Sequence, residues 1–128
     1  MVKDKVRISD FHFDHKLWMN ELKFFEMQLE VFEGRLEEVV VGLTSRSALA
    51  AVEAFQNQII RQREVIDELK HKFRLRDRDL DAYDDNKELD SDHMLFIDHR
   101  KEHDDMQIFI KLYQEMREKY MRFLDEHA

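Results

Sequence analysis

Apolar residues recur at helical spacing along most of this chain, and that spacing limits the possible folds more than any other feature. The first such seam steps by four and three residues over about four heptads. Its members are Phe11, His15, Trp18, Leu22, Phe25, Leu29, Phe32, Leu36 and Val39. The chain has no proline and only two glycines, whereas sheet-rich folds need both for their turns. The sequence therefore predicts an all-α fold.

Two interruptions of the apolar pattern divide the chain into three long helices. The first follows Gly42, where the segment 44–47 (Thr-Ser-Arg-Ser) offers N-cap residues. The second is an acidic tip at 77–92, which carries eight acidic residues and two basic ones. We expect helices at about 10–41, 45–80 and 88–127, after a loose lead-in at 1–9. Short connections predict a single domain over 1–128, an antiparallel up-down-up bundle with coiled-coil-like packing.

A bundle of three such long helices is thin, and its core cannot accommodate every apolar residue. In the third helix we assign the core seam to Leu89, Phe96, Met106, Ile110, Tyr113, Tyr120 and Leu124. The apolar residues that lie off the three seams are Phe24, Val31, Val41, Ile60, Val65, Phe109 and Phe123. Because these residues are left without a place in the core, we expect a homo-oligomer or a helical protein partner.

Charge and composition exclude several classes of partner. The net charge is −8, from 29 acidic and 21 basic side chains, whereas a nucleic-acid partner requires clustered Lys and Arg. No stretch approaches the roughly 20 consecutive apolar residues of a membrane span, and residues 1–10 lack the apolar centre of a signal sequence. The absence of cysteine excludes thiolate chemistry. We expect a cytoplasmic protein that binds neither nucleic acid nor membrane.

Six of the seven histidines fall at one end of the predicted bundle, and three of these are expected to face its core. His15 lies in the seam of the first helix, and His99 and His103 lie one turn apart in the third. Imidazole is the commonest neutral metal ligand, and bundle cores assemble such ligands from several helices. The sequence therefore predicts a Zn, Fe or Cu site on these three residues. Weaker candidate ligands are His12, Glu68, His71 and Glu102.

Two short motifs bear on this site. The His99-x-x-x-His103 pair is similar to one helix pattern of the hemerythrins, but the resemblance covers five residues. The other paired His/carboxylate segments of that family are lacking at matching places, so the resemblance implies neither a di-iron site nor oxygen binding. Glu68 and His71 form a Glu-x-x-His motif like that of di-iron bundle helices, yet the expected orientation of His71 is away from the seam.

A metal-free interpretation of the histidine end also stands. Core histidines are often neutral and form hydrogen bonds with Tyr, Gln or carboxylate groups. Burial would then lower the pKa of these histidines, and acid would destabilise that end of the bundle.

The acidic tip admits a second metal interpretation. Positions 1, 3, 5, 9 and 12 of an EF-hand loop match Asp77, Asp79, Asp81, Asp85 and Glu88. However, Ala82 stands where the sharp turn of that loop needs glycine, and Asp84 replaces an apolar residue. We therefore favour a solvated acidic turn over a calcium site.

The sequence contains little that points to an enzyme. Cysteine is absent, no serine or threonine lies beside a base, and no glycine-rich phosphate loop is present. Our leading hypothesis is a non-enzymatic helical binding or scaffold module with a histidine-rich transition-metal site. The alternative is a metal-free module for helical protein–protein interaction or oligomerisation, and a metal-dependent oxidoreductase ranks third.

Overall fold

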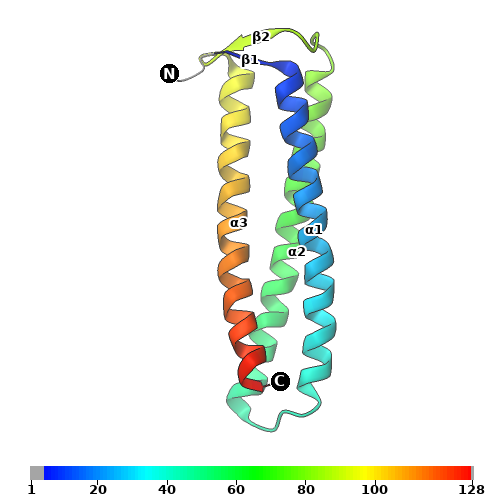
Figure 1. Ribbon diagram of the computed structural model, residues 1–128, viewed down its shortest axis with the longest axis vertical. Helices are drawn as coiled ribbons and strands as arrows, with labels where there is room; N and C mark the ends of the chain where they lie inside the picture. Colours follow the sequence, from blue (N-terminus) through cyan, green and yellow to red (C-terminus); the bar gives the residue numbers. More distant parts are fainter. Residues whose placement is uncertain (1–4, 128) are drawn as a thin grey trace.

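The computed structural model describes residues 5–127, which form three long helices side by side in an up-down-up arrangement (Figure 1). These are α1 (Ile8–Val40), α2 (Arg46–Leu80) and α3 (Met94–His127). The backbone N–H of Ala48 donates to the hydroxyl of Ser45, which caps α2 as its position before the helix predicts. The predicted all-α, three-helix fold is confirmed.

A small antiparallel sheet, which sequence analysis missed, lies across one end of the bundle (Figure 1). Strand β1 (Lys5–Arg7) pairs with β2 (Glu88–Asp90), with Val6 opposite Leu89. Two predictions are thereby corrected. In the described part of the lead-in, residues 5–7 form a strand and residues 8–9 already belong to α1. The third helix begins at Met94, because residues 88–90 are extended and paired.

The start of α1 is joined to the acidic tip by the backbone. The first N–H groups of a helix have no partner within the helix. Here the amides of Ile8 and Ser9 donate to the carbonyls of Lys87 and Asp85, each over 3.0 Å. The tip therefore holds the first turn of α1 in place next to the end of α2.

Two apolar clusters stabilise the bundle. The main core runs along the three helices and includes Leu22, Ile66 and Tyr113. A smaller sheet-end cluster consists of Ile8, Phe11, Leu80 and Leu89, all at most 3% exposed. Burial of one such large side chain contributes about 1.5–3 kcal/mol. Within residues 5–127 no helix has both the length and the apolar character needed to cross a membrane.

The buried face of α3 differs from the predicted one. Its buried residues are Glu102, Met106, Phe109, Tyr113, Met116, Tyr120 and Phe123, which step by four and three residues. Phe109 and Phe123 were therefore wrongly assigned to the outside, because they are members of this seam. Val65 is half-buried against the main core, while Phe24, Val31, Val41 and Ile60 are exposed as expected.

Candidate metal centre

Two helices bring three ligand-type side chains together between the apolar clusters. They are His15 on α1 and His99 and Glu102 on α3, with side chains 4%, 11% and 2% exposed. Each offers one ligand atom, and these atoms all lie within 4.8 Å of one another. His99 stacks on Phe11 from the sheet-end cluster and on Trp18 from the main core, with ring centroids 4.2 and 5.0 Å apart. The group is therefore enclosed by apolar rings.

The local sequence explains this convergence. His15 occupies a seam position of α1, seven residues before Leu22. His99 and Glu102 are three residues apart, which places them on one face of α3. Helix periodicity thus directs all three side chains inward, and the up-down-up arrangement of the helices brings them to one level of the bundle.

Glu102 lies at the centre of the group. Its Oε2 atom is 2.8 Å from His15 Nε2 and 3.8 Å from His99 Nδ1. Ligand atoms about 2.0–2.1 Å from a tetrahedral ion are about 3.3 Å from one another. The two observed distances lie on either side of that value, and the ligand atoms of the group all lie within 4.8 Å of one another, so the three side chains are close enough to share one ion after small shifts.

Each histidine is oriented through its second ring nitrogen by a carboxylate on another helix. His15 Nδ1 lies 2.9 Å from Asp77 Oδ1 on α2. His99 Nε2 lies 2.9 Å from Asp14 Oδ2 on α1. Metal-binding histidines characteristically donate their other N–H to a carboxylate in this way, which fixes the tautomer and the ring.

Glu102 is oriented in the same manner. Its second oxygen, Oε1, is 3.2 Å from the Nε atom of Arg76 on α2. Arg76 also lies 3.6 Å from Asp98. The Arg76 guanidinium compensates part of the cost of burying the carboxylate, because it supplies an opposite charge within hydrogen-bonding distance.

The pKa values of the two imidazoles are shifted in opposite directions. Burial lowers the pKa of His15, but its hydrogen bonds with Glu102 and Asp77 outweigh burial, and the pKa is raised above 6.5. Burial also lowers the pKa of His99; the Asp14 hydrogen bond opposes this only in part, and the net pKa is below 6.5. The prediction of a lowered pKa is wrong for His15, because two carboxylates contact one ring.

A small cavity adjoins the group. It measures about 10 Å³ and is lined by all three ligand-type residues together with apolar side chains such as Leu80. A space of this size accommodates about one water molecule. The arrangement thus leaves room for an ion, or for one further small ligand on it, without opening the core.

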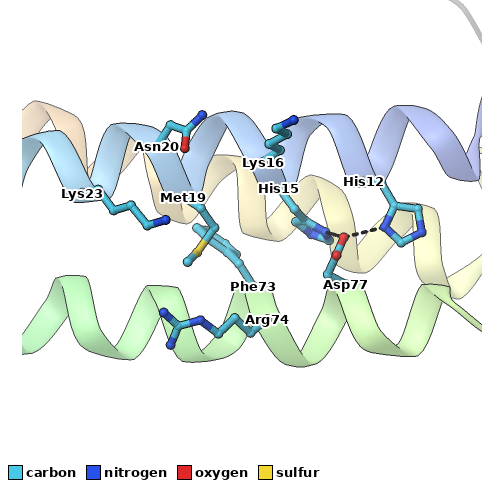
Figure 2. Close-up of a pocket in the computed structure, with 9 residues that line it drawn as sticks. All are labelled: His12, His15, Lys16, Met19, Asn20, Lys23, Phe73, Arg74 and Asp77. Carbon is cyan, nitrogen blue, oxygen red and sulfur yellow. Dashed lines mark hydrogen bonds and ion pairs between the residues drawn. The ribbon is translucent and has the colours of Figure 1, made fainter.

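A larger pocket of about 520 Å³ opens between α1 and α2 beside this group. Figure 2 shows Asp77 at one end of the pocket, between the rings of His12 and His15. His12 Nδ1 is 2.6 Å from Asp77 Oδ1, and the side chain of His12 is 25% exposed. His12 therefore contacts the supporting carboxylate and reaches solvent, rather than facing Glu102.

The expected inward orientation of His103 is wrong. Its side chain is 55% exposed and lies 3.6 Å from Asp104. Because the α3 seam passes through residues 99, 102 and 106, His103 lies on the solvent side, and Glu102 takes the inward position. Of the other weaker candidates, Glu68 is 67% exposed and 3.7 Å from Arg61, and His71 is exposed; both point away from the group.

The acidic tip does not form the EF-hand-like loop that was the second, less favoured metal interpretation of the sequence. Asp77 and Asp79 belong to α2, which continues to Leu80, and Glu88 belongs to β2. An EF-hand requires these positions in one twelve-residue loop. Asp81 and Asp85 instead lie 3.8 and 3.9 Å from His12 Nε2.

Sequence reasoning missed the supporting residues Asp14 and Arg76 and placed Asp77 in the wrong kind of site. The ligands His99 and Glu102, in contrast, could have been predicted from the spacing of apolar residues in the third helix. Counting back from Phe123 in steps of three and four reaches Glu102 and then His99. The supports have no such signal, because they depend on how the helices face one another.

Chemically, the group offers two imidazole nitrogens and one carboxylate oxygen in an enclosed, low-polarity site. This donor set suits a divalent transition-metal ion. No family model matches this chain, and no curated protein or solved structure is significantly similar to it.

Proposed function

We propose that this chain is a non-enzymatic helical binding module that holds one divalent transition-metal ion between α1 and α3. The proposed ligand atoms are His15 Nε2, His99 Nδ1 and Glu102 Oε2, and the ion is Zn²⁺, Fe²⁺ or Cu²⁺. One observation carries the proposal. Each of the three side chains is oriented, through its other polar atom, by a charged residue of a different helix.

The donor set supports this choice of ions. Imidazole nitrogen with carboxylate oxygen suits Zn²⁺, Fe²⁺ and Cu²⁺, whereas Ca²⁺ prefers a shell made only of oxygen. A metal ion would replace the proton that His15 shares with Glu102, so binding releases protons and weakens as the pH falls. The enclosure by Phe11 and Trp18 favours retention of the ion over turnover of a substrate.

Binding would also stabilise the fold, because the ligands come from two helices. An ion present at 100 times its Kd adds about 2.7 kcal/mol to the free energy of unfolding. For a domain of this length that corresponds to a rise in Tm of roughly 6–12 °C. The experiment uses the full chain, purified without an affinity tag and stripped with a chelator, and titrates each ion by calorimetry and thermal unfolding. Absence of both heat and a Tm shift with all three ions would refute the proposal.

Substitutions locate the site. We expect His99→Gln to remove one ligand and weaken binding by more than the roughly 10–100-fold typical of a supporting residue. Asp14→Asn keeps all three ligands and should weaken binding within that 10–100-fold range. The matched control is His103→Ala, one turn away and 55% exposed, which should leave affinity unchanged. A loss in the control equal to that of His99→Gln would place the ion elsewhere.

Exposed apolar side chains support a second candidate, a module for helical protein–protein interaction that needs no ion. Phe24, Met27 and Val31 on α1 are between 55% and 68% exposed. Exposed apolar residues that gather on one face mark interaction surfaces more often than scattered ones do. The oligomeric mass of the chelator-treated chain tests this candidate independently of metal binding.

A further inference from the structure

Helix α1 carries a second apolar stripe on the side opposite its core seam. The outer stripe occupies positions 13, 17, 20, 24, 27, 31, 34, 38 and 41, which again step by four and three. Each position follows a core-seam position by two residues, a rotation of about 200° around the helix. Six members are apolar and 44–86% exposed: Phe13, Leu17, Phe24, Met27, Val31 and Val41.

A repeat of this kind is the pattern by which one helix packs along another. Isolated exposed apolar residues mean little on a protein surface. Here, however, five follow one heptad register along α1, and the sixth, Val41, continues that register at the C-cap. The opposite face of the same helix is used by the bundle. The outer stripe is therefore a helix-packing surface with no partner within residues 5–127.

The charges beside the outer stripe indicate the partner. On one flank, four exposed residues recur every seven positions: Lys16, Lys23, Glu30 and Glu37. None forms an ion pair with another residue in the described range 5–127, although the nearby Glu26 and Glu33 pair with Lys70 and Arg63 on α2. The flank is basic in its first half and acidic in its second. Such a flank is complementary to a reversed copy of itself.

On the opposite flank, at positions 14, 21, 28 and 35, three of the four side chains are already used within the chain. Asp14 contacts His99, and the Gln28 side chain accepts a hydrogen bond from Tyr113. Arg35 pairs with Glu38 at 2.8 Å. We call the flank with Lys16, Lys23, Glu30 and Glu37 the free flank. Parallel pairing of two α1 helices would place the free flank of each chain against the occupied flank of the other. It would also place Glu38 next to the partner's Glu38. Antiparallel pairing places free flank against free flank.

We propose that the outer stripe pairs antiparallel with the same stripe of a second copy of this chain. With Phe24 packed against the partner's Met27, Lys16 lies beside the partner's Glu37 and Lys23 beside the partner's Glu30. Two-fold symmetry repeats each ion pair. In the same register Leu17 packs over the partner's Gly34, where a Cβ atom would meet nothing within 4 Å in the single chain.

The pairing does not depend on the metal centre. The ligands lie on the core faces of α1 and α3, whereas the outer stripe faces away from the core. Failure of metal binding therefore leaves this proposal intact, and a monomeric protein leaves the metal proposal intact.

Charge reversal on the free flank tests the pairing and its direction. The full chain is examined by sedimentation equilibrium after chelator treatment, and we expect a dimer. Lys16→Glu with Lys23→Glu makes the flank entirely acidic and should raise the dimer Kd by about 10–100-fold. Glu30→Lys with Glu37→Lys makes it entirely basic and should have the same effect. An equimolar mixture of the two variants should recover a heterodimer.

The variant with all four reversals gives the decisive result. Its flank is acidic in the first half and basic in the second, which is again complementary to a reversed copy, so antiparallel pairing predicts recovery of the homodimer. Parallel pairing predicts the weakest dimer of all, because two of the reversed residues, at positions 16 and 30, then face the unchanged like charges of Glu21 and Arg35. Phe24→Glu, which places a charge in the central layer, should give a monomer.

Controls separate pairing from folding. Lys111→Glu with Lys119→Glu makes the same change in charge at exposed positions of α3 and should leave the dimer Kd unchanged. Circular dichroism should show unchanged helicity in every variant, because all the altered side chains are exposed. A monomeric native chain, a dimer indifferent to the flank reversals, or loss of the dimer in the α3 control would overturn the proposal.

Discussion

Replacement of Glu102 by Gln is expected to lower the free energy of unfolding of the metal-free protein by about 1–3 kcal/mol, the usual cost of removing one partner from a buried polar group. Glu102 is 2% exposed and contacts both His15 and Arg76. Gln has the same shape, so no cavity forms. The larger loss of 3–5 kcal/mol that follows from an unpaired buried ion does not apply. His15 can release its proton, and Arg76 is 40% exposed and remains hydrated.

The same substitution should change how stability depends on pH. The pKa of His15 is raised in the folded chain, so its ion pairing stabilises the fold fully below pH 6.5 and this stabilisation is lost as the pH rises through the raised pKa. Without the Glu102 carboxylate, only Asp77 opposes the effect of burial, and the pKa of His15 falls. The difference in unfolding free energy between native and variant protein should therefore be largest in mild acid and smaller in alkali.

The measurement is urea unfolding of both proteins on either side of pH 6.5, with an NMR titration of the His15 ring. The expected loss corresponds to a fall in Tm of roughly 3–12 °C. Glu102→Asp is the companion variant, since it keeps the charge and shortens the side chain. Equal stability of native protein and Glu102→Gln at every pH, with an unchanged His15 titration, would show that this contact does not stabilise the fold. A loss independent of pH would show that only packing was disturbed.

Further predictions concern other parts of the chain. Asp77→Asn should lower the pKa of His15, because that ring loses one of its two carboxylates, and NMR titration would show no change if the contact were absent. Leu89→Ala should cost about 2–5 kcal/mol in urea unfolding, since it opens the sheet-end cluster; a cost below 1 kcal/mol would contradict its role there. Burial raises the pKa of Tyr113 and Tyr120 to about 12, so an absorbance titration should show neither ionising near pH 10 while the fold persists.

The three-helix fold was predictable because periodicity requires no knowledge of neighbouring elements. The α1 seam from Phe11 to Val39 proved correct because every one of its positions is apolar or aromatic, whereas the stripe on the opposite face is interrupted by Asn20, Gly34 and Glu38. The α3 seam was misassigned because Ile110 and Leu124, both apolar and only partly buried, lie next to the true seam positions Phe109 and Phe123. This error in the seam rotated the predicted inner face of α3, so that His103 was predicted to point inward and Glu102 to lie on the flank.

Helical spacing in the sequence could not predict the supporting residues or the small sheet. Asp14, Arg76 and Asp77 lie on flanks of their helices, where the sequence shows only ordinary charged residues. Their roles arise from the relative rotation of the helices, which depends on the packing of all three. The pairing of Val6 with Leu89 joins residues more than 80 positions apart and leaves no local pattern.

The buried polar group has a role in alignment that does not depend on a metal ion. A shift of α3 by one heptad relative to α1 would move apolar residues opposite His15 and leave Glu102 buried without its partner, at a cost of several kcal/mol. Apolar pairs such as Phe25 with Phe109 carry no such penalty, because one apolar side chain replaces another. The polar layer therefore selects one alignment of the three helices, as single polar residues do in coiled coils. A site that already holds its helices in register is also preorganised for an ion, because the arrangement of ligands is achieved on folding and little further ordering accompanies binding.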